Sequence, residues 1–198
     1  MIKSPTYVHG LTFVALAASM ACVPASSWAQ QAQTVEIVGE AGLRCTLGQP
    51  TQGSGALTNF DTPSGTVFSI TQLADPETLT TQAANITLSL DAMCNSLHRV
   101  IIASDNNGLW RTGSAATGGF GDAVPYQANL VWADQQHLMT ADTSSRRNVE
   151  ETILINRPNS GQMLIEFDIN TGATNAGIGA PLLAGEYSDV LRITVEAQ

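Results

Sequence analysis

The chain closes with the stretch Gly185-Glu186-Tyr187-Ser188-Asp189-Val190-Leu191-Arg192-Ile193-Thr194-Val195-Glu196. Side chains of a β-strand point alternately to its two faces, and here the apolar Tyr187, Leu191, Ile193 and Val195 share one face. Charged and hydroxyl side chains mostly occupy the other face. The pattern predicts a half-buried strand that runs almost to the last residue, and such a strand needs a sheet to pair with.

The first 29 residues have the pattern of a secretory signal peptide. Lys3 is near the start, an apolar run follows from Leu11 to Val23, and Ser27-Trp28-Ala29 has small residues where signal peptidase reads the chain. The apolar run is too short for a stable membrane span. We expect the mature chain to begin near Gln30; a lipoprotein signal at Cys22 is the alternative.

The mature chain is strongly acidic. Lys3 is the only lysine, so removal of residues 1–29 leaves seven arginines against seventeen acidic residues and a net charge of about −10. This charge argues against a nucleic-acid partner, which needs basic surface to neutralise phosphates. The remaining length suits one domain with a sizeable core, which we place at residues 39–198.

Two cysteines remain after cleavage, Cys45 and Cys94. Export exposes them to an oxidising compartment, and each falls on the apolar face of its predicted strand, so we expect them to pair. Closing a loop of about 50 residues would stabilise the fold by roughly 4 kcal/mol. The alternative is two buried free thiols.

Alternation of apolar and polar residues recurs along the mature chain between clusters of Gly, Asn, Asp, Pro and Ser. No window keeps a helical period, so the predicted class is all-β. Besides the closing strand, we predict an extended N-terminal run with Val35, Ile37, Leu43, Cys45 and Leu47 on one face, and strands at Ala84 to Cys94, Thr66 to Ile70, Arg99 to Ala103, Val124 to Ala133, Val149 to Asn156 and Gln162 to Ile169.

Glycine-rich polar connections separate these strands, at Gly48 to Gly55, Gly113 to Asp122 and Asn170 to Pro181. They lack apolar side chains to bury, so we expect them on the surface. Antiparallel strands at this spacing with a single disulfide favour a sandwich over a closed barrel.

The sequence shows no pattern typical of an active site. His98 and His137 each lack a second ligand nearby in sequence and are expected at the surface or at strand edges. Asp105-Asn106-Asn107-Gly108 starts like a calcium loop but lacks the closing glutamate, so we interpret it as a turn. Gly113 to Gly121 has no lysine or helix to hold a phosphate. We expect no catalytic residue, no metal site and no cofactor.

Paired carboxylates are the remaining candidates for chemistry. Glu150 and Glu151, or Glu166 and Asp168, could serve the acid and base roles of a glycoside hydrolase, which needs two carboxyl groups roughly 5 to 10 Å apart. Glu166 and Asp168, however, fall on the outward face of an alternating strand and are more simply solvated charges.

Several motifs together resemble the spore coat protein U domain family, which includes the Csu-type subunits of archaic chaperone-usher pili. The motifs are Cys45-Thr46-Leu47-Gly48, the second cysteine at a strand end, Val124-Pro125-Tyr126-Gln127-Ala128-Asn129-Leu130, and the closing Ala-Gly-x-Tyr-x-Asp pattern at Ala184 to Asp189. The resemblance covers the mature chain, and the closing motif is its specific part. The family's Asn-Phe-Gly appears here as Asn59-Phe60-Asp61.

The resemblance implies an immunoglobulin-like sandwich that lacks one strand. A periplasmic chaperone would first fill the open groove, and at an outer-membrane usher the N-terminal extension of the next identical or related subunit would replace it, giving a head-to-tail fibre on the cell surface for adhesion or biofilm formation. The donor would be residues 30–38 with Val35 and Ile37 as plugs, and the groove would include Tyr187, Leu191, Ile193 and Val195. Alternatively, Val35 and Ile37 form a first strand of their own domain.

Two other functions stay open at this point. A self-contained secreted sandwich could bind a carbohydrate or protein ligand through exposed aromatic side chains, for which Trp110, Phe120 and Trp132 are the candidates. An acid hydrolase using Glu150 or Glu151 is the third possibility.

Overall fold

The structure is a computed structural model that describes residues 36–61, 64–113, 115 and 118–198. The chain divides into two compact units, Met1–Glu40 and Ala41–Gln198. Residues 36–40 are the described part of the first unit; they contain no strand and are all exposed. The predicted signal peptide and the predicted plug Val35 lie outside the described residues.

The described part of the second unit is all-β, as predicted, and contains no helix. No membrane-crossing helix is found among the residues that the structure describes. In chain order the strands are β1 (Cys45–Leu47), β2 (Thr51–Thr58), β3 (Ala84–Cys94), β4 (His98–Ser104), β5 (Leu109–Arg111), β6 (Ala123–Val124), β7 (Tyr126–Trp132), β8 (Gln135–Ala141), β9 (Val149–Ile155), β10 (Asn159–Ile169), β11 (Tyr187–Ser188) and β12 (Leu191–Ala197).

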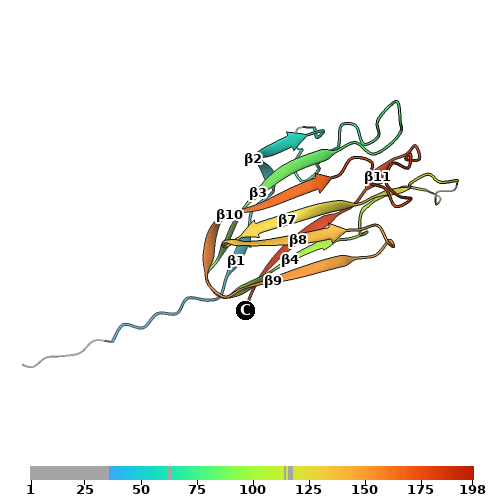
Figure 1. Ribbon diagram of the computed structural model, residues 1–198. Helices are drawn as coiled ribbons and strands as arrows, with labels where there is room; N and C mark the ends of the chain where they lie inside the picture. The colour runs from blue at the N-terminus through green and yellow to red at the C-terminus, as the bar shows by residue number, and fades with distance from the viewer. Residues whose placement is uncertain (1–35, 62–63, 114, 116–117) are drawn as a thin grey trace, which may run out of the picture. The chain divides into compact units, whose positions relative to one another are not determined.

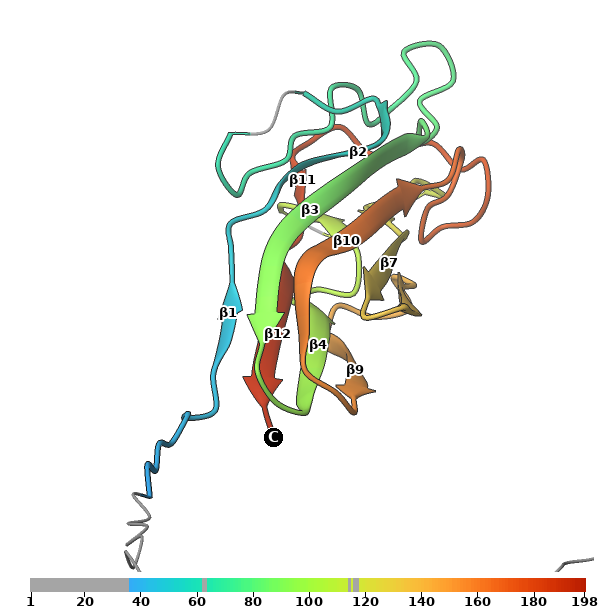
Figure 2. The ribbon, with the colours of Figure 1, turned by 90° about the vertical axis from the view of Figure 1, so that its left-hand side faces the viewer.

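The strands lie in two layers, and every named strand pair is antiparallel (Figure 1). The large sheet has the order β1-β3-β10-β7-β8, with β2 following β1 along the same edge of β3. A second sheet has the order β12-β4-β9, and a short sheet has the order β11-β5-β6. Figure 2 looks onto β3 and β10, with β12, β4 and β9 behind them. This arrangement is consistent with a β-sandwich.

The core fills the space between the layers, where alternate side chains of each strand point inward. The apolar face predicted for residues 84–94 is buried throughout, as is that of residues 124–132. Facing them are Val100 and Ile102 of β4, both 0% exposed, and the buried Ile153 and Ile155 of β9. Strict alternation in the sequence therefore predicted the core correctly in these strands.

The predicted strands at residues 99–103, 149–156 and 162–169 correspond to β4, β9 and β10. Two predicted strands are interrupted. Pro125, which lacks a backbone N–H, separates β6 from β7. Asp189 and Val190 separate β11 from β12 in the closing stretch.

Three predictions in the N-terminal half are wrong in whole or in part. Residues 66–70 form no strand and make only isolated bridges, Ser64 with Val67 and Phe60 with Ile70. The predicted connection at Gly48 to Gly55 is at the surface, as expected, but it is largely strand β2, because Gly53 and Gly55 pack closely on β3. In the predicted N-terminal run only Cys45–Leu47 is a strand among the described residues, and Leu43 is 68% exposed rather than inward-facing.

Candidate functional site

Strand β12 lies at one edge of its sheet. Its pairing with β4 is regular from Leu191 opposite Ser104 to Ala197 opposite His98, with no shift of register. Among the described residues no strand pairs with the other side of β12. A regular edge of this kind presents a row of backbone N–H and C=O groups that a further strand could pair with.

The predicted groove residues Leu191, Ile193 and Val195 lie on the inward face of β12, whereas Tyr187 lies on β11, which precedes β12 and pairs with β5. Tyr187, Leu191, Ile193 and Val195 are all half-buried and pack against the core. Their neighbours one strand further in are fully covered: Ile193 is opposite Ile102, which is 0% exposed. The apolar face of the sheet therefore continues to its edge, where its cover becomes incomplete.

Strand pairing along the facing edge of the large sheet is irregular, whereas the pairing of β12 is regular. Strand β1 lies near β12, and β2 continues along β3 with a register shift between Gln52 and Leu57. At Gly55 an added Cβ would lie 1.8 Å from the Thr87 hydroxyl oxygen, so only glycine fits there. A bulge with glycines protects an edge against further pairing, which leaves β12 as the regular edge on this side of the sandwich.

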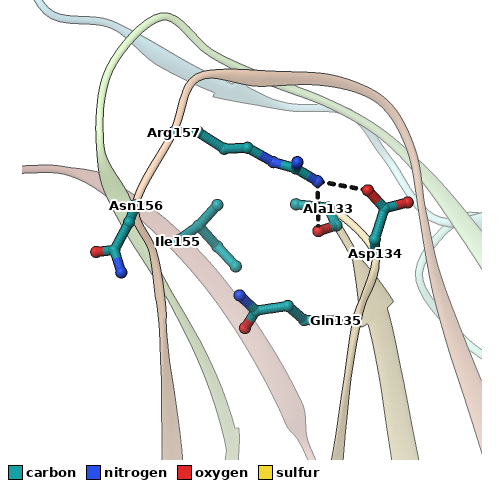
Figure 3. Close-up of a pocket in the computed structure, with 6 residues that line it drawn as sticks. All are labelled: Ala133, Asp134, Gln135, Ile155, Asn156 and Arg157. Atoms are coloured by element: carbon teal, nitrogen blue, oxygen red, sulfur yellow. Dashed lines mark hydrogen bonds and ion pairs between the residues drawn. The ribbon is translucent and has the colours of Figure 1, made fainter.

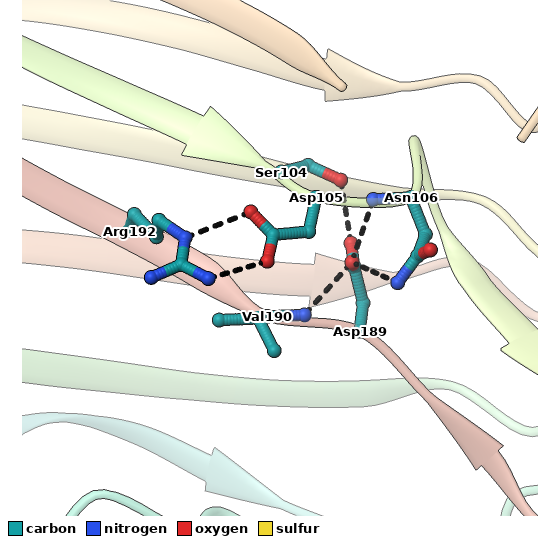
Figure 4. A network of polar contacts seen from close by, with 6 residues as sticks. All are labelled: Ser104, Asp105, Asn106, Asp189, Val190 and Arg192. Carbon is teal, nitrogen blue, oxygen red and sulfur yellow. Dashed lines mark hydrogen bonds and ion pairs between the residues drawn. The ribbon is translucent and has the colours of Figure 1, made fainter. Parts of the chain in front are cut away.

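Asp189 lies between β11 and β12, and its carboxylate accepts hydrogen bonds from neighbouring elements (Figure 4). Its Oδ1 accepts from the backbone N–H groups of Asn106 and Val190, at 3.0 and 2.8 Å, and from the Asn106 side-chain amide at 3.1 Å. Its Oδ2 accepts from the Ser104 hydroxyl at 2.5 Å and from the Tyr126 hydroxyl at 2.7 Å. Asp189 thus ties the closing motif to β4, to the turn after it and to β7.

Two of the hydrogen-bond partners of Asp189 are buried. Ser104 is 0% exposed and Tyr126 is 3% exposed. Burial, and then the nearby negative charge of Asp189, raise the pKa of Tyr126 well above its ordinary value, so its hydroxyl stays a donor. Both motifs quoted for the family resemblance, around Tyr126 and around Asp189, therefore meet in one hydrogen-bond network. The hydrogen bond between Tyr126 and Asp189 was not predicted from the sequence, in which the two residues are 63 positions apart.

The outer face of β12 carries two ion pairs with neighbouring elements. Arg192 donates to Asp105 from Nε and Nη2, at 2.8 and 2.7 Å, and this pairing lowers the pKa of Asp105. Arg99 of β4 donates from Nε to Glu196 at 2.7 Å. The positive and negative ends of β12 are therefore each paired on the β4 side.

The predicted disulfide between Cys45 and Cys94 is present and joins β1 to the end of β3. Next to it, the Asn95 side chain accepts from the Arg44 N–H at 2.7 Å and donates to the Gly42 carbonyl at 2.8 Å. These contacts hold the chain where it enters the domain, beside the turn between β3 and β4. The C-terminal end of β12 is at the same turn, since Gln198 donates its N–H to the Leu97 carbonyl at 2.8 Å.

Two described residues of the predicted donor segment, Ile37 and Val38, are apolar and exposed, and Glu36 beside them is charged and exposed. Ile37 is 93% exposed and Val38 is 84% exposed. Such side chains favour burial, which the described part of the first unit does not supply. Whether Ile37 serves as a donor plug or as a first strand of its own domain stays a prediction.

The histidine predictions are half right. His137 is at the surface on β8, with its Nε2 3.3 Å from Glu151. His98 is not at the surface: it is 1% exposed, its Nε2 accepts from the Trp132 indole N–H at 2.9 Å, and its Nδ1 is 3.0 Å from the Ser96 carbonyl. In the described ranges no group of three or more His, Cys, Asp or Glu could hold a metal ion.

The three aromatic side chains considered for a carbohydrate-binding surface differ in how deeply they are buried. Trp132 is 2% exposed, so it belongs to the core and not to a binding surface. Trp110 is half-buried, and its indole N–H donates to the Asn106 carbonyl at 2.6 Å. Phe120 keeps 38% of its surface exposed.

The carboxylate candidates have local partners. Glu166 and Asp168 lie on β10 and accept from the side-chain amides of Asn129 and Asn85, each at 3.0 Å. Glu150 is exposed on β9, and Glu151 contacts His137. The role of these carboxylates as acid and base of a hydrolase stays a prediction without a supporting contact.

Hollows among the residues that the structure describes include the following two. One of about 330 Å³ lies between the turns after β7 and after β9, where Arg157 donates to Asp134 and to the Ala133 carbonyl (Figure 3). The other, of about 500 Å³, is mostly apolar and is lined by Leu73, Ala74, Leu79, Phe120, Leu182, Leu183, Ala184, Gly185 and Tyr187. At its wall the Tyr187 hydroxyl donates to the Leu183 carbonyl at 2.8 Å, and burial raises the pKa of Tyr187 to about 12.

Compared with known proteins, the chain matches no protein-family model, no curated protein and no solved structure.

Proposed function

We propose that this chain is a structural, non-catalytic subunit of a secreted surface fibre of the chaperone-usher type. In this proposal the domain is an immunoglobulin-like sandwich that lacks one strand, and a donor strand completes it. A periplasmic chaperone supplies that strand first; the N-terminal extension of another subunit replaces it during assembly at an outer-membrane usher. The fibre then serves adhesion or biofilm formation.

The observation that carries the proposal is the edge of β12. This strand is regular, pairs on one side only within the described chain, and has a half-covered apolar face made of Leu191, Ile193 and Val195; Tyr187 of the preceding β11 is half-buried as well. Strand addition suits such an edge because the added backbone satisfies the unpaired N–H and C=O groups while alternate side chains fill the face. The facing edge of the large sheet is less suited to strand addition, because β2 has a register shift there and Gly55 packs closely on Thr87.

The donor in this proposal is the segment that ends at residue 38, with Val35 and Ile37 as its plugs. The exposed Ile37 supports this role, because an isoleucine that is 93% exposed has apolar surface to bury. The disulfide and the Asn95 contacts supply a firm point from which an extension can act.

The test is an unheated denaturing gel of the protein exported to the periplasm, with and without residues 30–38, beside boiled samples. Donor-strand assembly gives a ladder that survives detergent, collapses on boiling and vanishes on truncation. A single cooperative monomer from both proteins would overturn the proposal.

A matched pair of variants locates the donor more finely. Ile37→Asp should abolish the ladder, because a carboxylate cannot enter an apolar groove without a large cost. Ile178→Asp changes a loop isoleucine that is 95% exposed and should leave the ladder unchanged. Loss of the folded monomer in Ile37→Asp would mean instead that Ile37 belongs to the core of its own domain.

A self-contained binding module is the second candidate, and the apolar hollow beside Phe120 favours it. Its volume of about 500 Å³ lies in the range of small-molecule sites. A module of this kind should fold alone and form no ladder, so the same gel separates the two functions.

A further inference from the structure

We infer that Glu36 of one copy pairs with Arg192 of the next and thereby sets the direction and register of the added strand. The inference rests on the proposed function, since it concerns the strand that β12 receives. It adds a determinant on the outer face of the sheet, whereas the plugs Val35 and Ile37 act on the inner face.

The outer face of β12 has an order of charges. Arg192, Thr194 and Glu196 follow one another on it, from positive through neutral to negative. The Arg192 side chain is 63% exposed although it pairs with Asp105. Since Asp105 engages Nε and Nη2, further N–H donors of the guanidinium remain for a second carboxylate. The charge at one end of this edge is therefore still able to select a partner.

The extension carries a negative charge, Glu36, on the face opposite to that of the proposed plugs Val35 and Ile37. Successive side chains of a strand point to opposite faces, so Glu36 points outward if Ile37 enters the groove. Thr34, Val38 and Glu40 are the other outward positions. Glu36 is thus the carboxylate flanked by the two proposed plugs.

The two ends of the domain favour an antiparallel direction. Residues 42–44 leave the domain at the turn between β3 and β4, and β12 ends at the same turn. A donor strand parallel to β12 would place the domain of the donor copy at this turn, where the acceptor copy's own chain enters its domain. An antiparallel donor strand places the domain of the donor copy at the other end of β12, next to β11.

Within the antiparallel direction, charge selects the register. With Glu36 opposite Arg192, Ile37 is opposite Leu191, Val35 is opposite Ile193, and no like charges meet on β12. The next slip sets Glu36 opposite the neutral Thr194. The slip after that sets Glu36 opposite Glu196, and this like-charge contact offsets the pairing of Glu40 with Arg192 in that register. Directly opposed unlike charges stabilise a strand pair and like charges destabilise it, so the first register is favoured.

Cysteine pairs in the exported full-length chain test the register. Glu36→Cys combined with Arg192→Cys should give disulfide-linked oligomers on a boiled, non-reducing gel, because directly opposite Cβ atoms are close enough to bridge. Glu36→Cys combined with Thr194→Cys or with Glu196→Cys are the matched controls and should stay monomeric on that gel. Links from either control, or a link within one monomer, would overturn the inference.

Charge reversal tests the cause. Glu36→Arg and Arg192→Glu should each lower ladder formation about two- to fivefold, and the double variant should restore it. Glu40→Arg is the matched control, since it reverses an exposed extension charge that has no partner in this register. A double variant that folds, as shown by urea titration, but does not restore the ladder contradicts the inference. Failure of the proposed function is distinguishable, because the unaltered protein would then give no ladder at all.

Discussion

At the scale of single residues, Asp189 decides how the last strand joins the domain. It accepts five hydrogen bonds, from Ser104, Tyr126, Val190 and twice from Asn106. Asp189→Ala would leave buried donors without an acceptor. We expect a loss of about 3 kcal/mol in the free energy of unfolding, measured by urea titration. Glu166→Ala is the control and should cost less than about 0.5 kcal/mol; equal losses would contradict the role of Asp189.

Asp142 gives a prediction for acid pH. The Ser144 N–H, and then the Ser144 and Asn107 side chains, lower the pKa of Asp142 to about 2. A carboxyl with a depressed pKa stabilises the fold above its unfolded pKa of about 4, and this contribution is lost as the pH falls toward 2. Because Asp142 is exposed, solvent screening keeps the effect to about 1 kcal/mol or less.

Urea titrations at several pH values check this. Asp142→Asn should be less stable than the unaltered protein at pH 6, and the difference should shrink as the pH falls from about 4 to about 2. A difference that does not depend on pH would show that the Asp142 charge is unimportant.

At the scale of elements, β2 can pack closely on β3 because Gly53 and Gly55 have no side chains at the contact with Thr87. An added Cβ at Gly55 would lie 1.8 Å from Oγ1 and 2.4 Å from Cβ of Thr87. We expect Gly55→Ala to destabilise the fold by about 1 to 3 kcal/mol, since Thr87 is buried and the strand has to move away. Gly42→Ala, where nothing lies within 4 Å, is the matched control for thermal unfolding. Similar melting temperatures for the two variants would contradict this packing.

The element that sequence analysis missed most clearly is β8. Its hairpin with β7 turns through Ala133 and Asp134, both with positive φ, 53° and 62°. Such turns usually carry Asn-Gly or Asp-Gly, so Ala-Asp gave no signal, and the backbone conformation is imposed by the pairing of the two strands.

At the scale of the whole molecule, one covalent link ties the start of the domain to the large sheet. Cys45 and Cys94 are 49 residues apart, and closing such a loop is worth about 4 kcal/mol in the chain-entropy account. We expect the variant with both Cys45→Ala and Cys94→Ala to have a free energy of unfolding lower by about this amount. It should therefore unfold at a lower urea concentration. Reducing agent should shift the unaltered protein in the same direction and leave the double variant unchanged. No shift in either case would contradict a stabilising disulfide.

By itself the sequence determined the all-β class, the core faces of β3 and β7, and the cysteine pair. These follow from alternation, because a strand with one apolar face must bury that face whatever its neighbours are. The half-buried face of Tyr187, Leu191, Ile193 and Val195 was also predictable from this local rule.

Only the tertiary structure decided which strand is an edge, which side chains meet around Asp189, and that His98 and Trp132 pair inside the core. Alternation cannot supply these facts. It says that a side chain points inward but not which strand lies beside it, and His98 and Trp132 are separated by 34 positions in sequence. Edges, networks and burial of polar side chains depend on contacts between distant segments, which form only when the sheets pack together.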